Sequence, residues 1–164
     1  MIRRKALLLL AGGLTATALA GCTSFAPVYG DMSYNGLAAA RFNFAPPTNR
    51  TEQIILQRLQ IAFPNQAGPT DPTLKVSAYV SSLPGVMSNA MAVASPVGVR
   101  VEGTVTITSG GEKLFEAKRF TDSAYQGGKL TPTNTFSAQG EQEATAESTA
   151  EALRAAILAG YRPR

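Results

Sequence analysis

Two segments of this chain alternate apolar and polar residues with a period of two. In residues 97–108 the valines and an isoleucine fall on one side, and arginine, glutamate and threonine fall on the other. Residues 74–82 repeat the pattern, with leucine, valine and alanine against lysine, serine and tyrosine. Strict alternation is typical of strands that have one buried and one solvated face. The sequence therefore predicts an antiparallel sheet that is covered on one side only.

A tight turn follows the stronger of these strands. Residues 109–112 read Ser-Gly-Gly-Glu, which is typical of a β-hairpin because adjacent glycines accept the positive φ angles of such turns. The returning strand is expected over residues 114–125. Its apolar phase is broken at Phe120, so we expect a β-bulge near Lys118 and Arg119.

A short strand and a helix precede the sheet strands. Residues 37–44 place Phe42 and Phe44 on one face, and a proline pair ends this strand. Residues 49–63 carry apolar side chains at helical spacing. Asn49, with a glutamate three positions later, forms a capping-box pattern, so we expect the helix to begin there.

The C-terminal segment predicts a second, longer helix over residues 138–159, with Ser137 as the N-cap and Gly160 as a C-cap candidate. Its apolar stripe is narrow and rich in alanine, which lets the helix lie close to a sheet. The stripe consists of Ala146, Ala150, Leu153 and Ile157. The element order β-α-β-β-β-α then predicts an α+β two-layer sandwich, with two helices on one face of a mainly antiparallel four-stranded sheet.

The N-terminal residues read as a lipoprotein signal peptide over residues 1–21. Basic residues 3–5 lead into an apolar run that is too short to span a bilayer comfortably. Leu-Ala-Gly then precedes Cys22, the only cysteine of the chain, as in a lipobox. We therefore expect lipidation at Cys22, a tether over residues 22–36 and a single domain over residues 37–164.

Lipidation of Cys22 competes with one alternative, an ordinary secreted protein that happens to have a cysteine there. An unpaired cysteine in an exported protein needs an explanation, and a thioether-linked lipid supplies one. Two or three acyl chains hold a protein firmly on a membrane. Thr23 follows the cysteine where inner-membrane lipoproteins carry aspartate, which favours the outer membrane.

Composition argues against several functional classes. Three of the fifteen basic residues lie in the signal peptide, so the mature chain has twelve basic and eleven acidic residues and no general attraction for nucleic acid. The chain has no histidine, which excludes Ser-His-Asp and Cys-His nucleophiles and nearly all zinc sites. Glu143, Glu147 and Glu151 line one helical stripe, as expected of a solvated face. We therefore expect a protein that is not an enzyme and needs no cofactor or metal.

The chain resembles the LPS-assembly lipoprotein family, and its alphaproteobacterial members most of all. The residues that carry the resemblance are Gly21-Cys22, the tether residues 25–30, residues 47–53 at the start of the first helix, and the alanine-rich terminal helix. The resemblance covers nearly the whole mature chain, although each motif is degenerate. This family supplies the lipoprotein half of the outer-membrane translocon for lipopolysaccharide (LPS).

The resemblance implies a role without chemistry. Such a lipoprotein sits as a plug inside a large outer-membrane β-barrel partner, facing the periplasm. It helps that barrel fold and helps pass LPS to the cell surface. Cys22 is the one residue carried over individually as functional.

Basic side chains are the candidates for contacts with the phosphates of LPS, because Lys and Arg donors recognise phosphate oxygens. The candidates project from the best strand, the hairpin end, the expected bulge and the loop before the last helix. They are Arg100, Lys113, Lys118, Arg119 and Lys129. The alternative for each of them is an ordinary surface charge. The apolar loop over residues 84–96 either extends the hairpin or contacts acyl chains or the barrel wall.

A second function is compatible with the same features. An auxiliary lipoprotein of an ABC-type lipid or solute transporter would share the anchor and a similar α/β build. An envelope hydrolase would need a pair of carboxylates that meet in space.

Overall fold

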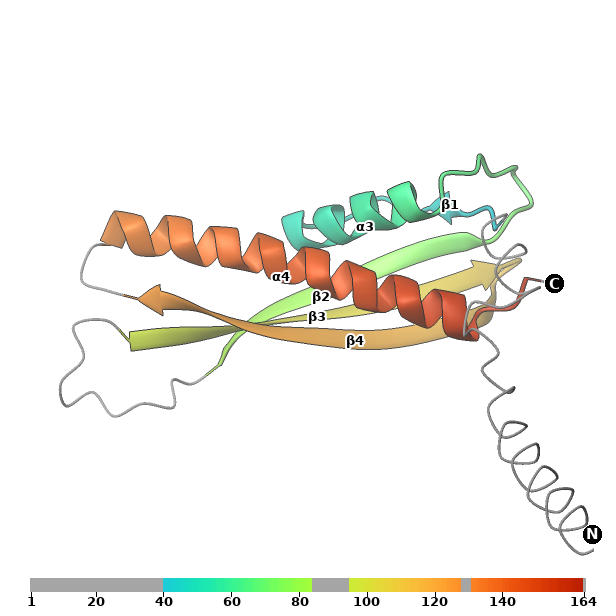
Figure 1. Cartoon of the computed structure of the whole chain (residues 1–164). Helices are drawn as coiled ribbons and strands as arrows, with labels where there is room; N and C mark the ends of the chain where they lie inside the picture. The colour runs from blue at the N-terminus through green and yellow to red at the C-terminus, as the bar shows by residue number, and fades with distance from the viewer. Residues whose placement is uncertain (1–39, 84–94, 128–130, 164) are drawn as a thin grey trace, which may run out of the picture. The chain divides into compact units, whose positions relative to one another are not determined.

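A computed structural model describes residues 40–83, 95–127 and 131–163 of the chain, all within one compact unit, Gly36–Arg164. In these residues a four-stranded sheet, ordered β1-β2-β3-β4, carries two helices, α3 and α4, on one face (Figure 1). Helix α3 lies against β2, and α4 lies against β3 and β4. The predicted α+β two-layer sandwich with the order β-α-β-β-β-α is therefore confirmed. The expected signal peptide and tether lie outside the described residues.

Three long strands make up most of the sheet. They are β2 (Thr73–Leu83), β3 (Ser95–Ser109) and β4 (Glu112–Gly127), and each pairs antiparallel with the next. Gly110 and Gly111 form the turn between β3 and β4 with φ angles of 57° and 84°. The predicted hairpin is confirmed, because both positions adopt the left-handed conformation that favours glycine.

One extra residue interrupts the pairing of β3 with β4 close to this turn. Ile107 lies opposite Phe115, whereas Thr108 lies opposite Lys113. Leu114 is therefore the extra residue of a β-bulge. The bulge moves β4 by one position, and this is what turns Phe115 toward the helices.

The bulge predicted near Lys118 and Arg119 is wrong. Both residues continue the regular pairing, and Arg119 lies opposite Gly103 on the helix side of the sheet. Strand β4 lies at the edge of the sheet, where a long charged side chain in the buried phase still reaches water. Phe120 lies opposite Glu102, on the side of the sheet away from the helices, so its place in the sequence requires no β-bulge.

Of the first strand predicted over residues 37–44, residues 37–39 lie outside the described part, and residues 40–42 are not in a strand. Only β1 (Asn43–Phe44) pairs with β2, and it does so in parallel. The backbone N–H of Asn43 donates to Pro72 O and that of Ala45 to Leu74 O, both at 2.9 Å. The proline pair at residues 46–47 has no N–H to donate, so the ladder ends there.

Helix α3 (Arg50–Ala62) begins where its capping box predicts. The Asn49 side chain accepts from the backbone N–H of Glu52 at 2.9 Å. The Glu52 carboxylate in turn accepts from the backbone and hydroxyl of Thr48, and from the backbone N–H of Ala78 at 3.2 Å. Glu52 is only 5 % exposed, so this cap also fastens the helix to strand β2 beyond the end of β1.

Helix α4 (Thr131–Gly160) begins seven residues before the predicted start. Ser137 is therefore inside the helix and is not its N-cap. Pro132 is the second helical residue, a position in the first turn where the missing N–H costs nothing. The first turns are mainly polar and largely exposed, so they carry no apolar stripe from which a helix could be predicted.

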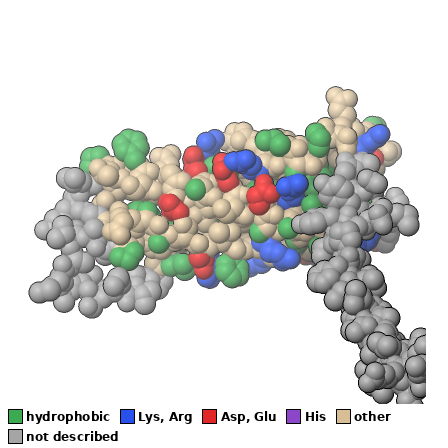
Figure 2. All heavy atoms as spheres, in the orientation of Figure 1, with side chains coloured by type: hydrophobic (Ala, Val, Ile, Leu, Met, Phe, Trp, Pro, Cys, Tyr) green, Lys and Arg blue, Asp and Glu red, His purple; other side chains and the backbone are tan. Residues whose placement is uncertain are grey.

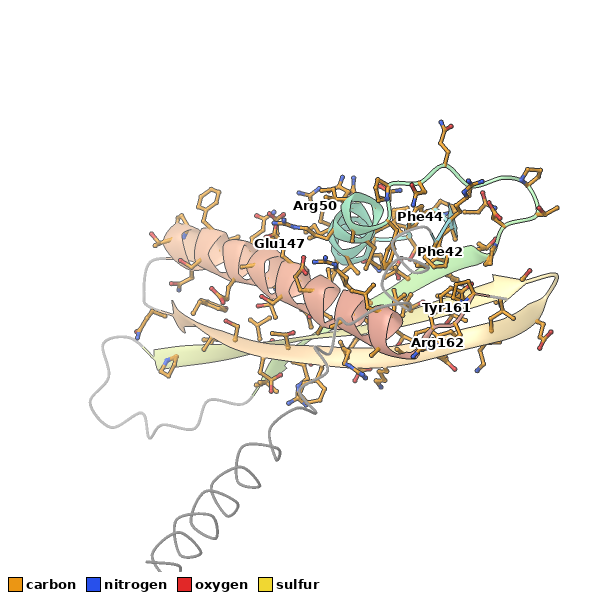
Figure 3. The ribbon with its side chains drawn as sticks, turned by 45° about the vertical axis from the view of Figure 1, so that its right-hand side comes forward. Phe42, Phe44, Arg50, Glu147, Tyr161 and Arg162 are labelled. Atoms are coloured by element: carbon orange, nitrogen blue, oxygen red, sulfur yellow. The ribbon has the colours of Figure 1, made fainter. Side chains whose placement is uncertain are left out.

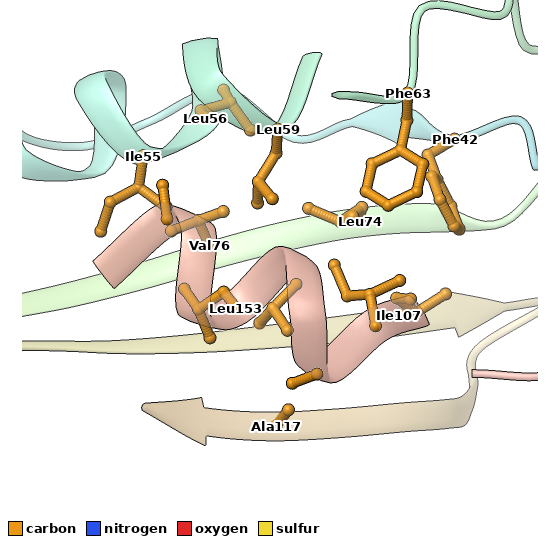
Figure 4. Packing of buried hydrophobic residues seen from close by; sticks show 14 of the residues in the cluster. Phe42, Ile55, Leu56, Leu59, Phe63, Leu74, Val76, Ile107, Ala117 and Leu153 are labelled. Atoms are coloured by element: carbon orange, nitrogen blue, oxygen red, sulfur yellow. The ribbon is translucent and has the colours of Figure 1, made fainter. Parts of the chain in front are cut away.

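The core lies between the helices and the sheet (Figure 4). All four residues of the predicted α4 stripe are at most 1 % exposed. A Cβ atom added at Gly103 would lie 2.9 Å from Leu153 Cδ1, so α4 approaches β3 too closely for a larger residue. The buried Thr149 hydroxyl donates to Thr145 O at 2.9 Å, which satisfies it inside the core. No helix of the described part of the chain is long and apolar enough to cross a membrane.

Candidate functional site

The face of the sheet away from the helices is the candidate functional surface, and we call it the open face. No described element covers it. Cross-strand partners point to the same side of a sheet, so the registers place the outward residues of three strands together. The open face consists of Thr73, Lys75, Ser77, Tyr79, Ser81 and Leu83 of β2, Gly98, Arg100, Glu102, Thr104, Thr106 and Thr108 of β3, and Lys113, Glu116, Lys118, Phe120, Asp122 and Ala124 of β4.

Two exposed aromatic side chains lie in the middle of the open face. Tyr79 and Phe120 both lie opposite Glu102, one on each side, and they are 67 % and 58 % exposed. Two strand spacings separate them, which is about 10 Å. The open face thus presents a row of two aromatic rings with a carboxylate between them.

Arg100, a predicted LPS contact, lies on the open face beside this row. Its guanidinium donates two hydrogen bonds of 2.6 Å to the Asp122 carboxylate and lies 4.6 Å from the centroid of the Phe120 ring. The hydrogen bonds from Arg100 hold the pKa of Asp122 below its usual value, and those to Asp122 raise the pKa of Arg100. The arginine is therefore held by a fork-shaped ion pair and a cation–π contact.

Lys118, a second predicted contact, lies on the same face and is also paired. Its Nζ lies 2.6 Å from Glu102 Oε1. Lys113 lies next to the turn, with its Nζ 2.5 Å from Glu116 Oε2. The structure thus brings Arg100 and Lys118 onto one surface, but every predicted cation of this surface already has a carboxylate partner.

The remaining predicted site residues do not join this group. Arg119 lies on the helix side of the sheet, where its guanidinium donates to Lys118 O at 2.7 Å. Lys129 and the lipidation site Cys22 lie outside the described residues, as do residues 84–94 of the apolar loop predicted over 84–96. Their predicted roles stay predictions. The last two residues of that predicted loop, Ser95 and Pro96, already belong to strand β3.

Sequence reasoning missed the aromatic row and the acidic partners of the cations. A signal for the row was present, because Tyr79 occupies the polar phase of its strand and Phe120 breaks the apolar phase of the next. A large apolar residue in the solvated phase points to a contact surface, since a strand that only faces water has no need of it.

The end of the domain where β1 meets α4 is built differently. Phe42 and Tyr161, labelled in Figure 3, pack with ring centroids 5.4 Å apart, and Phe63 lies 5.3 Å from Phe42. Burial, with the nearby Asp71 carboxylate, raises the pKa of Tyr161. A hollow of about 460 Å³ lies beside Asp71 and Tyr161. The neutral, buried phenol and its aromatic neighbours form a structural cluster that fastens the end of α4 to β1.

The outer surface of the helices carries acidic and basic side chains side by side (Figure 2). Arg50 pairs with Glu143 at 3.2 Å and Arg58 with Glu147 at 2.5 Å, which links α3 to α4. A hollow of about 560 Å³ lies near Arg50, between the helices and the end of β4. The acidic residues of α4 thus meet basic partners on a solvated surface and do not converge on one another.

Comparison with known proteins identifies the fold. No family model matches the chain, and no curated protein is similar to it in sequence. Solved structures with a similar fold include the following three. A predicted lipoprotein from Caulobacter crescentus has a TM-score of 0.53 and 14 % identity over 77 % of this chain and 92 % of its own.

The other two structures are also bacterial lipoproteins. A minor lipoprotein from Acinetobacter baumannii has a TM-score of 0.50 and 17 % identity, over 73 % of this chain and 90 % of its own. The rare lipoprotein B from Shewanella oneidensis has a TM-score of 0.55 and 10 % identity, over 71 % of this chain and 92 % of its own. At these identities the likeness establishes a shared fold, which extends over nearly the full length of each neighbour.

Proposed function

We propose that this protein is a lipid-anchored outer-membrane lipoprotein that plugs and helps assemble the β-barrel translocon for LPS, and that it assists delivery of LPS to the cell surface. The observation that carries the proposal is the combination of a lipobox cysteine at Cys22 with a fold shared with three bacterial lipoproteins. The family resemblance in residues 21–30 and 47–53 supplies the specific role.

A membrane anchor at Cys22 fits the architecture of the domain. Two or three acyl chains would hold the first mature residue at the bilayer, since each buried methylene contributes about 0.8 kcal/mol. The eighteen positions from Cys22 to residue 39 would connect that anchor to the described domain. The domain would then face the periplasm, next to any barrel in the same membrane.

A role in binding and assembly also fits the surfaces. The carboxylates of α4 and of the open face are engaged in ion pairs with basic side chains. Such pairs lie on exposed surfaces and do not form the juxtaposed carboxylates that a hydrolase without histidine would require. These ion pairs support the proposal that the protein acts as a subunit.

Affinity purification of the full lipidated chain from detergent-solubilised envelopes tests the proposal. We expect a large outer-membrane β-barrel protein to co-purify. Recovery of the chain with no barrel protein would contradict the proposal. Depletion of the protein separates the two candidate functions. Loss of surface LPS supports the translocon, whereas loss of one transport activity with normal surface LPS indicates the transporter lipoprotein.

Lipidation is tested by Cys22→Ser with metabolic palmitate labelling. We expect the unchanged chain to incorporate label and the variant to lose it, because the thioether cannot form on serine. Thr23→Ser is the matched control and should label normally. Label on the Cys22→Ser chain would show that the anchor is elsewhere.

A further inference from the structure

We propose that the open face of the sheet is the surface with which this protein docks on the inner wall of its β-barrel partner. The inference rests on the proposed function and adds the surface that makes the contact. Its centre is the row of Tyr79, Glu102 and Phe120.

The aromatic row supplies the apolar part of such an interface. Large hydrophobic side chains exposed on the described domain are Ile61, Tyr79, Phe120 and Phe136. Ile61 and Phe136 belong to different helices, whereas Tyr79 and Phe120 lie in one cross-strand row. Aromatic and arginine side chains that cluster on a surface provide most of the binding energy of protein interfaces. Among the surfaces that the structure describes, the open face alone combines two aromatics with an arginine stacked on one of them.

The charges of the open face decide the chemistry of the partner. Arg100 is bound to Asp122, Lys118 to Glu102, and Lys113 to Glu116. Lys75, the remaining cation of the open face, has no ion pair with a described residue, but at the three paired cations an anionic ligand would have to displace a carboxylate. A polar but uncharged surface could instead cover the pairs while each charge keeps its partner. The interior wall of an outer-membrane barrel is polar.

Hydroxyl groups fill the rest of the surface. Ser77 and Thr104 lie in one cross-strand row with Lys118, Thr106 lies between Lys75 and Glu116, and their hydroxyls can both donate and accept hydrogen bonds. The helix side, by contrast, presents glutamines and ion pairs of α3 and α4 to water. The open face therefore resembles an interface core in which every charge except Lys75 has a partner, and the helix side resembles a solvated surface.

Site-specific photo-crosslinking in intact cells tests the inference. A photoreactive residue replaces Tyr79 or Phe120 in the full lipidated chain, and Ile61 or Phe136 serves as a control of similar exposure on a helix. We expect crosslinks to the barrel protein from the two open-face positions only. Crosslinks from the helix positions, from all four positions alike, or from the open face to LPS in place of protein would overturn the inference.

A double variant provides a second measurement. Tyr79→Ser with Phe120→Ser should lower recovery of the barrel protein about tenfold or more, as expected for loss of two central aromatics. Ile61→Ser with Phe136→Ser should leave recovery unchanged. Both double variants should keep the thermal midpoint of the unchanged domain, because all four side chains are exposed. Full recovery with the open-face variant would overturn the inference.

The two proposals fail in different ways. If the barrel protein co-purifies but crosslinks from the helix positions, the docking face is wrong and the proposed function stands. If the unchanged chain recovers no barrel protein, both the proposed function and this inference fall.

Discussion

The two faces of the sheet carry alternate residues of the same strands, yet one face is apolar and buried and the other is polar and exposed. On the covered face, Val101, Val105 and Ile107 are fully buried against α3 and α4. On the open face, the intervening Arg100 and Glu102 lie in ion pairs beside two exposed aromatics. One face is thus a dry, apolar contact within the domain. The other is a polar surface on which every charged side chain except Lys75 has an ion-pair partner, and no described element covers it.

This difference separates stability from recognition. Folding free energy depends on apolar area removed from water and on close packing, both of which lie on the covered face. The exposed ion pairs of the open face contribute little to stability because water and salt screen them. Substitution of a residue on the covered face is therefore expected to lower the free energy of unfolding. Substitution of its neighbour on the open face is expected to change binding and leave stability nearly unchanged.

The largest effect is expected from Ile107→Ala. Ile107 is fully buried, so loss of its side chain should cost about 2–5 kcal/mol of unfolding free energy through lost burial and a residual cavity. Thr106→Ala is the matched control, since Thr106 is the preceding residue on the open face, and it should stay within about 0.5 kcal/mol. Urea unfolding measures both. Equal losses would contradict the contrast between the faces.

A smaller loss is expected from Gly103→Val. A Cβ there would lie 2.9 Å from Leu153 Cδ1 and 3.1 Å from Thr149 Cγ2, so these two buried side chains of α4 would have to shift. Overpacking of this kind costs about 1–3 kcal/mol. Thr104→Val, on the open face, should be tolerated in the same urea assay. A stable Gly103→Val variant would mean that α4 lies farther from the sheet.

Glu52→Gln tests the buried cap of α3. Burial alone would raise the pKa of Glu52, but hydrogen bonds from Thr48, Ala78 and Asn49 lower it. The amide keeps one acceptor oxygen in place of two, so we expect a loss on the order of 1.5 kcal/mol at neutral pH. Glu147→Gln, on the solvated helix surface, is the control and should change little.

The pH dependence of the Glu52→Gln variant has a definite sign. The folded-state pKa of Glu52 lies below that of the unfolded chain, so the carboxylate stabilises the fold above the unfolded pKa of about 4.3. This stabilisation is lost as the pH falls through the folded pKa. Urea unfolding should therefore show the gap between the unchanged domain and the variant narrowing in acid. A gap that does not change with pH would exclude ionisation of Glu52 as its source.

The layers of the fold could be predicted from the sequence. A strand or helix with one buried face repeats its apolar residues at a regular spacing, and this spacing is visible in the sequence. Alternation in residues 74–82 and 97–108 assigns the two faces of β2 and β3 correctly, and the cap at Asn49 marks the start of α3. The start of α4 could not be predicted, since its first turns do not contribute to the core. A segment without buried residues has no period to detect.

The pairing of charges on the open face could not be predicted, because it depends on register. Counting back from the turn, where Ser109 lies opposite Glu112, would pair Arg100 with Thr121. The bulge at Leu114 shifts the register by one and pairs Arg100 with Asp122. From the sequence, Arg100 is therefore expected to be free to donate hydrogen bonds to a phosphate. In the fold its guanidinium is bound to the Asp122 carboxylate.

The smallest effect is expected from Arg100→Gln. Asp122 already occupies the guanidinium fork of Arg100. Replacing the arginine should therefore change neither the urea midpoint of the domain nor the affinity for purified LPS. The control is Asp122→Asn, which frees the Arg100 fork for an anion and should strengthen LPS binding at low salt more than at high salt. Weaker LPS binding by Arg100→Gln would show that the arginine leaves Asp122 for a phosphate. The open face would then bind the anionic ligand directly. The two faces of the sheet would differ in ligand binding as well as in packing.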